Sequence, residues 1–108
     1  MSALPKRDRR INGRVVIPYP ARFFGVDIDG RFFKETTHVE NISACGVYMR
    51  LKKGVRLMSR VGVAVRLSYG PTTEPALRLA TRGIVVRTEV LTDGTFGVAI
   101  EFLRRRML

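Results

Sequence analysis

Short runs of alternating apolar and polar residues constrain the fold of this chain more than any other feature. The clearest run places Val61, Val63, Val65, Leu67 and Tyr69 on one face. A period of two residues predicts a β-strand with one buried face. Comparable runs recur along the chain, and no long stretch has helical periodicity. The sequence therefore predicts an all-β domain.

Turn signals divide the alternating runs into six expected strands. Asp29-Gly30 and Asp93-Gly94 are typical of hairpin turns, and Gly70-Pro71 opens a loop. A polar turn at residues 41 to 46 and the dipeptide Lys53-Gly54 mark two further breaks. The expected strands cover residues 14–23, 31–42, 47–51, 61–69, 77–86 and 96–102.

A six-stranded antiparallel β-barrel is the most economical arrangement of these strands, because closure removes exposed sheet edges. We expect this barrel over residues 14–103. In the fifth strand the apolar residues change from odd positions to even positions around Arg82-Gly83, which predicts a β-bulge at a barrel corner. Pro18 and Pro20 lack N–H donors on the same lateral side, so the first strand should be unpaired there.

The two ends of the chain are expected to lie outside the barrel. Residues 1–13 show no periodic pattern, and Pro5, Asn12 and Gly13 disfavour a helix. We interpret them as a flexible basic arm, and residues 104–108 as a short basic tail.

Length and composition indicate one globular domain. The chain has 108 residues, and 45% of them are apolar, which is enough to build a core. No apolar run is long enough to cross a membrane, and the start lacks the pattern of a signal peptide. We therefore expect a cytoplasmic protein. The single Cys45 cannot form an intrachain disulfide.

The charge balance indicates an anionic partner. The formal net charge is +11, from 20 basic and 9 acidic residues, and 16 of the basic residues are arginine. Arginine binds phosphate through two parallel hydrogen bonds and stacks on flat rings, which lysine does not do. The excess alone does not identify the partner.

Signals for catalysis are weak. His38 lies in the middle of an expected strand, and Asp27 and Asp29 belong to a turn, where such carboxylates are usually solvated. The chain has no nucleophile elbow, no phosphate-binding loop and no cluster with metal-ligand spacing. We predict a protein without enzymatic activity, metal or cofactor.

Two polar stretches are the candidate binding site. The first is Arg9-Arg10-Ile11-Asn12-Gly13-Arg14, in which a turn would let two guanidinium groups converge on one anion. The second is Asn41-Ile42-Ser43-Ala44-Cys45-Gly46, which offers an amide, a hydroxyl and a glycine that allows a positive φ or a close backbone approach. Read alone, the first is compatible with a solvated tail and the second with an ordinary turn.

Together and in this order, the two stretches resemble the PilZ domain family. The family pattern is RxxxR, often preceded by a further arginine, and then a D/NxSxxG turn; here it is met by Arg10, Arg14, Asn41, Ser43 and Gly46. The resemblance extends over nearly the whole chain, including residues 83–87 and 96–102. PilZ domains are six-stranded antiparallel barrels of the Greek-key or split-barrel type, and they bind the bacterial second messenger cyclic di-GMP.

The resemblance implies a role for each matching residue. Arg10 and Arg14 would bind phosphates and guanine, and Arg9 would bind a second, stacked cyclic di-GMP if two molecules are taken up. Asn41 stands where many members have aspartate, and with Ser43 it would hydrogen-bond guanine or its neighbours. Gly46 would let the ligand lie close to the strand. The arm would then order across the barrel and signal to a partner protein or domain.

Two alternatives remain open at this stage. The first is a PilZ-like adaptor that binds protein and no nucleotide. The second is a basic small-barrel nucleic-acid-binding protein, in which Tyr48 could stack a base. We rank it last because aromatic residues make up only 8% of the chain, and most of them lie at the alternating positions that are expected to face the core.

Overall fold

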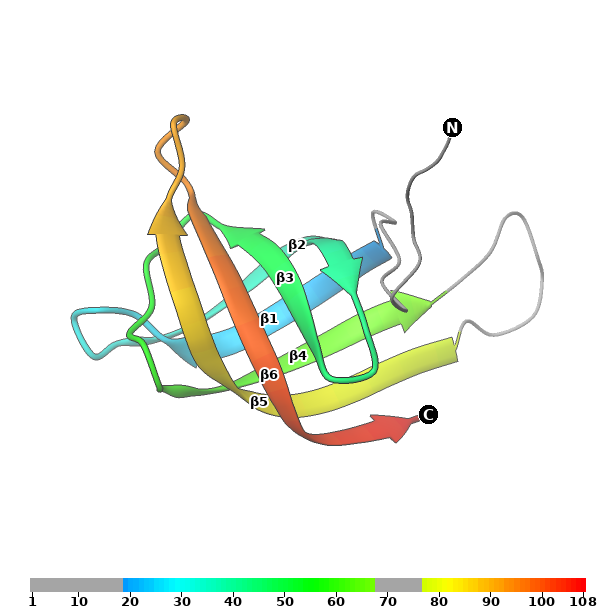
Figure 1. Ribbon diagram of the computed structural model, residues 1–108. Helices are drawn as coiled ribbons and strands as arrows, with labels where there is room; N and C mark the ends of the chain where they lie inside the picture. The colour runs from blue at the N-terminus through cyan, green and yellow to red at the C-terminus, as the bar shows by residue number, and fades with distance from the viewer. Residues whose placement is uncertain (1–18, 68–76) are drawn as a thin grey trace, which may run out of the picture.

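Six antiparallel strands close into a single β-barrel. The computed structural model describes residues 19–67 and 77–108 (Figure 1). The strands are β1 (Tyr19–Val26), β2 (Phe32–Ile42), β3 (Gly46–Leu51), β4 (Arg60–Leu67), β5 (Leu77–Val90) and β6 (Phe96–Met107). The prediction of an all-β, closed, six-stranded antiparallel barrel is confirmed.

The order of strands around the barrel differs from their order in the chain. The ring runs β1-β2-β3-β6-β5-β4, and pairing of β1 with β4 closes it. The connection from β3 to β4 therefore crosses the barrel, and β6 lies between β3 and β5. This insertion brings the last strand next to the turn at residues 41 to 46.

The core consists of the inward faces of all six strands. Phe23, Val39, Met49, Leu51 and Val85 are completely buried, and Ile100 contributes from β6. In β1 and β4 the buried residues alternate with exposed or half-buried ones, as the sequence pattern predicted. The β1–β4 ladder starts at Ala21, one residue after Pro20, which agrees with the expected break in pairing.

Three irregularities bend the ladders. The register between β5 and β6 shifts between Arg82 and Gly83, where the change of apolar phase had predicted a bulge. A second shift in the same pair lies between Val85 and Arg87. A third lies between Val39 and Asn41 on β2, so Glu40 is the extra residue there. The sequence did not predict the last two.

The two ends of the chain require one correction. The prediction of a basic tail at residues 104–108 is wrong, because β6 continues to Met107, which pairs with Leu79 on β5. Arginine-rich residues 104 to 106 extend the sheet because β5 provides a long partner for them. The expected arm at residues 1–13, including Arg9 and Arg10, and Arg14 at its end lie outside the described residues.

The described part of the chain contains strands and turns only. In residues 19–67 and 77–108, no helix is long and apolar enough to cross a membrane.

Candidate functional site

The turn at residues 41 to 46 lies at the end of the barrel where β1 begins. Tyr19, the first residue of β1, pairs with Val39, two residues before Asn41 on β2. Figure 1 shows the start of β1 beside the end of β2. The first residue of β1 thus lies opposite the part of β2 that leads into this turn.

Backbone hydrogen bonds shape the turn. The N–H of Ser43 donates to the carbonyl of Gly46 at 2.9 Å, and the Ser43 hydroxyl accepts from the N–H of Cys45 at 3.2 Å. The second bond is the side-chain-to-backbone contact of an ordinary serine turn. The hydroxyl retains its own proton, so Ser43 can still donate to a ligand.

Strand β6 holds the turn from the other side. The N–H of Phe102 donates to the carbonyl of Cys45 at 2.8 Å, and the Arg105 guanidinium donates to the carbonyl of Ala44. At Gly46, a Cβ atom would collide with the carbonyl oxygen of Ile100. Close approach of β6 therefore accounts for glycine at this position, and Gly46 does not have a positive φ.

Asn41, Ser43 and Gly46 line one surface hollow of about 630 Å³, which we call the turn hollow. Its walls come from β2, β3, β5 and β6. The other residues that line it are Cys45, Val47, Tyr48, Val86, Arg87, Glu89, Ala99, Ile100 and Glu101. A hollow of this size falls within the range of small-molecule sites, about 300–1,000 Å³.

Tyr48 lines the turn hollow and contacts two charged side chains. Its hydroxyl donates to a Glu89 carboxylate oxygen at 2.6 Å, and the Arg87 guanidinium lies 5.7 Å from its ring centre. The hydrogen bond to Glu89 is the main reason that the pKa of Tyr48 is raised above its usual value. A side chain at Gly97 would collide with the Tyr48 hydroxyl, so the phenol lies directly over the backbone of β6.

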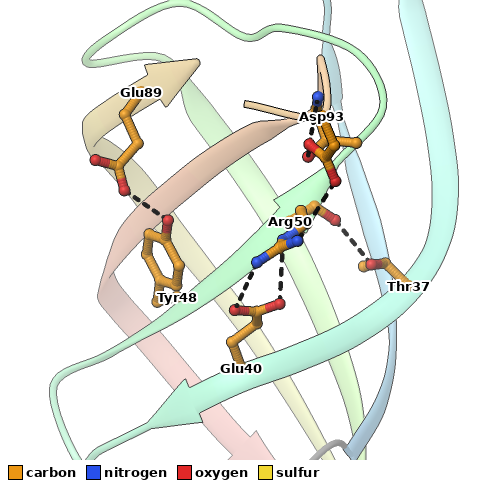
Figure 2. A network of polar contacts seen from close by, with 7 residues as sticks. Thr37, Glu40, Tyr48, Arg50, Glu89 and Asp93 are labelled. Atoms are coloured by element: carbon orange, nitrogen blue, oxygen red, sulfur yellow. Dashed lines mark hydrogen bonds and ion pairs between the residues drawn. The ribbon is translucent and has the colours of Figure 1, made fainter. Parts of the chain in front are cut away.

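A second polar group stiffens the neighbouring strands. Figure 2 shows Arg50 on β3 paired with Glu40 at 3.2 Å and with Asp93 at 3.5 Å. The hydroxyl of Thr37 donates to the Arg50 carbonyl at 2.8 Å. Glu40 is the bulge residue next to Asn41, so its ion pair with Arg50 links the end of β2 to β3 beside the turn hollow.

The structure brings three of the six predicted site residues together. Asn41, Ser43 and Gly46 lie on one hollow, whereas Arg9, Arg10 and Arg14 are outside the described residues.

Sequence reasoning missed three charged residues of the turn hollow, Arg87, Glu89 and Glu101. Their alternation marks them as strand residues, but only the insertion of β6 between β3 and β5 brings them to the turn.

The ionisable lining of the turn hollow is not strongly basic. Arg87 shares the lining with two carboxylates, of which Glu89 accepts the Tyr48 hydrogen bond and Glu101 has no ion pair with any described residue. The described part of the site therefore provides hydrogen-bonding groups, and a doubly anionic ligand would need further positive charge from elsewhere.

The residues considered for catalysis lie on a strand and in a hairpin turn. His38 is exposed on β2. One carboxylate oxygen of Asp27 accepts the N–H groups of Asp29 and Arg31, both at 2.9 Å, and the bond from Arg31 is the main cause of its lowered pKa. Among the described residues, no three histidine, cysteine, aspartate or glutamate side chains are grouped to hold a metal ion.

The fold and the site define a closed six-stranded β-barrel with a polar surface hollow formed by β2, β3, β5 and β6. Comparison of the chain with models of protein families, with curated proteins and with solved structures found no match.

Proposed function

We propose that this chain is a non-catalytic, PilZ-type receptor for cyclic di-GMP. The observation that carries the proposal is the position of the turn hollow. Asn41 and Ser43 line it, and Tyr19, which follows the arginine-rich stretch in the sequence, pairs with Val39 two residues before Asn41. The end of β2 that carries Asn41 is therefore within reach of the arginines that precede Tyr19 in the sequence.

The distance along the chain permits this contact. Arg14 precedes Tyr19 by five residues, and five residues span at most about 18 Å. Tyr19 pairs with Val39, so the reach of Arg14 includes Asn41. Arg10 is four residues further away, and a turn at Asn12-Gly13 would bring it back toward Arg14.

The turn hollow provides groups that match guanine. Guanine presents N7 and O6 as acceptors, for which Arg87 is a bidentate donor, and N1–H and N2–H as donors. Asn41 has no carboxylate to accept those two protons. Glu101 lies opposite Gly46 on β6 and lines the same hollow, so it can accept them instead.

The arm arginines would provide the positive charge that the hollow lacks. A micromolar site needs about 8 kcal/mol, and each charge-assisted hydrogen bond contributes roughly 1.5–3 kcal/mol, so several arginines must act together. Closure of the arm over the ligand would present a new surface to a partner protein or domain. Arg9 provides the contact for a second, stacked molecule.

Two variants and hydrogen exchange test the proposal. Addition of saturating cyclic di-GMP should slow amide exchange in residues 5 to 14 and at residues 41 to 46. Glu101→Gln should weaken binding about tenfold, because the neutral amide has one acceptor oxygen where the carboxylate has two, whereas Asp29→Asn at the distant hairpin should have no effect. Unchanged exchange in both segments would refute the proposal and favour an adaptor that binds protein only.

A further inference from the structure

Six arginines surround two alanines on the outer surface of the barrel, away from the turn hollow. Four strands contribute in register. Arg22 on β1 pairs with Ala64 on β4, Ala64 pairs with Ala80 on β5, and Ala80 pairs with Arg106 on β6. Residues directly opposite in antiparallel strands point to the same face. This row therefore has an arginine at each end and alanines in the middle.

The rows on either side add the other four arginines. Arg66 lies opposite Arg78, and Arg82 lies opposite Arg104. All six side chains are exposed. We call this group the arginine face; it consists of Arg22, Arg66, Arg78, Arg82, Arg104 and Arg106. With strands about 4.8 Å apart, it is roughly 14 Å wide at the backbone.

This arrangement is electrostatically unfavourable in the isolated chain. Like charges directly opposite each other destabilise a sheet, and the arginine face contains two such pairs. No arginine of the face forms an ion pair with a carboxylate in residues 19–67 or 77–108. A bound polyanion would remove this repulsion.

The arginine face is hollowed. One hollow of about 350 Å³ lies against Arg22, Arg66 and Arg78, and another of about 600 Å³ lies against Arg82, Arg104 and Arg106. Their floors include Ala64 and Ala80, whose small side chains let a ligand approach the sheet closely.

A third hollow adds aromatic side chains. It has a volume of about 550 Å³, is lined by Phe24, Phe32 and Gly62, and shares Ala80 and Arg82 with the second hollow. Phe32 is 68% exposed, an unusual position for so large an apolar side chain. Gly62 is paired with Phe24 on one side and with Arg82 on the other, so no side chain separates the Phe24 ring from the Arg82 guanidinium.

We propose that the arginine face and the adjoining phenylalanine hollow bind single-stranded nucleic acid. The arginines would contact successive phosphates, and Phe24 and Phe32 would stack bases, the combination that characterises sites without sequence preference. This site is separate from the turn hollow and independent of the proposed cyclic di-GMP function. The sequence alone ranked nucleic acid last on aromatic content. The register that places two phenylalanines beside six arginines depends on long-range strand pairing, which no local pattern encodes.

Other anionic partners fit the surface less well. The centre of a protein interface is depleted in charge and enriched in large apolar side chains, whereas the centre here is alanine and glycine ringed by arginine. A planar bilayer would meet the projecting side chains and leave the hollows unfilled.

Fluorescence anisotropy with a labelled oligo-dT of about 12 nucleotides tests the proposal, with salt varied between about 50 and 200 mM. The variant replaces Arg78, Arg82 and Arg106 by glutamine. Its matched control replaces Arg31, Lys52 and Arg56, which are exposed on the connections between strands, with the same loss of charge. Both triple variants keep residues 1–18 unchanged, so binding of the oligomer by those residues is the same in the variant and in its control.

The expected result is specific to the arginine face. Each phosphate contact contributes about −0.7 to the slope of log K against log salt, so the slope should be about 2 less negative in the variant and unchanged in the control. At the lower salt concentration, affinity should fall at least tenfold in the variant only. Equal slopes in the two triple variants would overturn the proposal.

A substitution without charge change tests the phenylalanine hollow. A Cβ at Gly62 would meet no atom closer than 3.7 Å, so a side chain can begin there, and Gly62→Leu, with its fold checked by thermal unfolding, would place an apolar side chain in the hollow. It should weaken oligo-dT binding about tenfold while an abasic oligomer binds as before. Binding of poly-glutamate or phosphatidylserine vesicles by the arginine face, without binding of oligo-dT, would replace the proposal by a protein or a membrane partner.

Discussion

The Arg105 guanidinium on β6 donates a hydrogen bond to the carbonyl oxygen of Ala44, at the centre of the turn that carries Asn41 and Ser43. The last strand of the barrel thus holds the candidate ligand-binding turn. Arg105 belongs to the segment that extends β6 beyond the expected barrel. The extension therefore has a structural role in the site.

Removal of this contact should loosen the turn without unfolding the barrel. We expect Arg105→Ala to weaken cyclic di-GMP binding about fivefold, because an exposed hydrogen bond of this kind contributes roughly 1 kcal/mol. Calorimetry would measure the affinity, and hydrogen exchange should show faster exchange at residues 43 to 46. The control is Arg31→Ala, at the β1–β2 hairpin. Equal loss of affinity in both variants would indicate a general charge effect.

Gly46 should be intolerant of any side chain. A Cβ there would collide with the carbonyl oxygen of Ile100, so Gly46→Ala must push β3 from β6. We expect a loss of about 1–3 kcal/mol in the free energy of unfolding, as for overpacked sites. Gly62→Ala is the matched control because its Cβ would meet ordinary contacts only. Similar melting temperatures of the two variants would contradict this account of Gly46.

The bond between Tyr48 and Glu89 should make stability depend on pH in the alkaline range. Folding raises the pKa of Tyr48, mainly through the hydrogen bond to Glu89, so the folded state favours the protonated phenol. This stabilisation is complete below the unfolded pKa of about 10 and is lost as the pH rises through the folded pKa. In Tyr48→Phe, stability should fall less steeply above pH 10. Denaturant unfolding at several pH values measures the free energy of unfolding. If it falls with pH equally in the wild type and in Tyr48→Phe, the pKa of Tyr48 is not raised by folding.

Met58 should be replaceable by glycine with a gain in stability. Its φ of 68° is the only positive φ of a non-glycine residue in the described parts of the chain. A non-glycine residue loses about 1–2 kcal/mol of folding free energy in this left-handed conformation, and glycine avoids that cost. Glycine in turn loses about 0.5–1 kcal/mol more than other residues through the backbone entropy lost on folding. We expect Met58→Gly to stabilise the barrel by about 0.5–1 kcal/mol.

The neighbouring residue provides the control. Leu57 is about as exposed as Met58, at 58% against 64%, but its φ is negative. Leu57→Gly should therefore destabilise the protein in thermal unfolding, while Met58→Gly should raise the melting temperature. Destabilisation by both substitutions would show that the Met58 side chain contributes more than its backbone costs.

The strands were predictable from the sequence because alternation is a local property. Val61, Val63 and Val65 are buried as expected, and the phase slip at Arg82-Gly83 is a bulge. The extension of β6 was not predictable in the same way. Residues 104 to 106 are all arginine and show no alternation, and their strand conformation depends on pairing with a distant segment of β5.

The candidate site was predictable only in part for the same reason. Asn41 and Ser43 lie two residues apart, so their common face follows from strand geometry. Arg87 and Glu101 join them through the insertion of β6 beside β3, a long-range choice that no local pattern encodes. Gly46 was expected to allow either a positive φ or a close approach, and the carbonyl of Ile100 identifies the close approach.

Isothermal titration calorimetry with cyclic di-GMP tests the central claim most directly. The wild-type chain, Arg14→Ala and the control Arg31→Ala would be titrated under the same conditions, with GTP as a second ligand. We expect micromolar or tighter binding of cyclic di-GMP by the wild type and Arg31→Ala, loss of binding in Arg14→Ala, and no response to GTP. The fitted stoichiometry would distinguish one bound molecule from two. Absence of heat with the wild type, or undiminished binding by Arg14→Ala, would contradict the proposed receptor function.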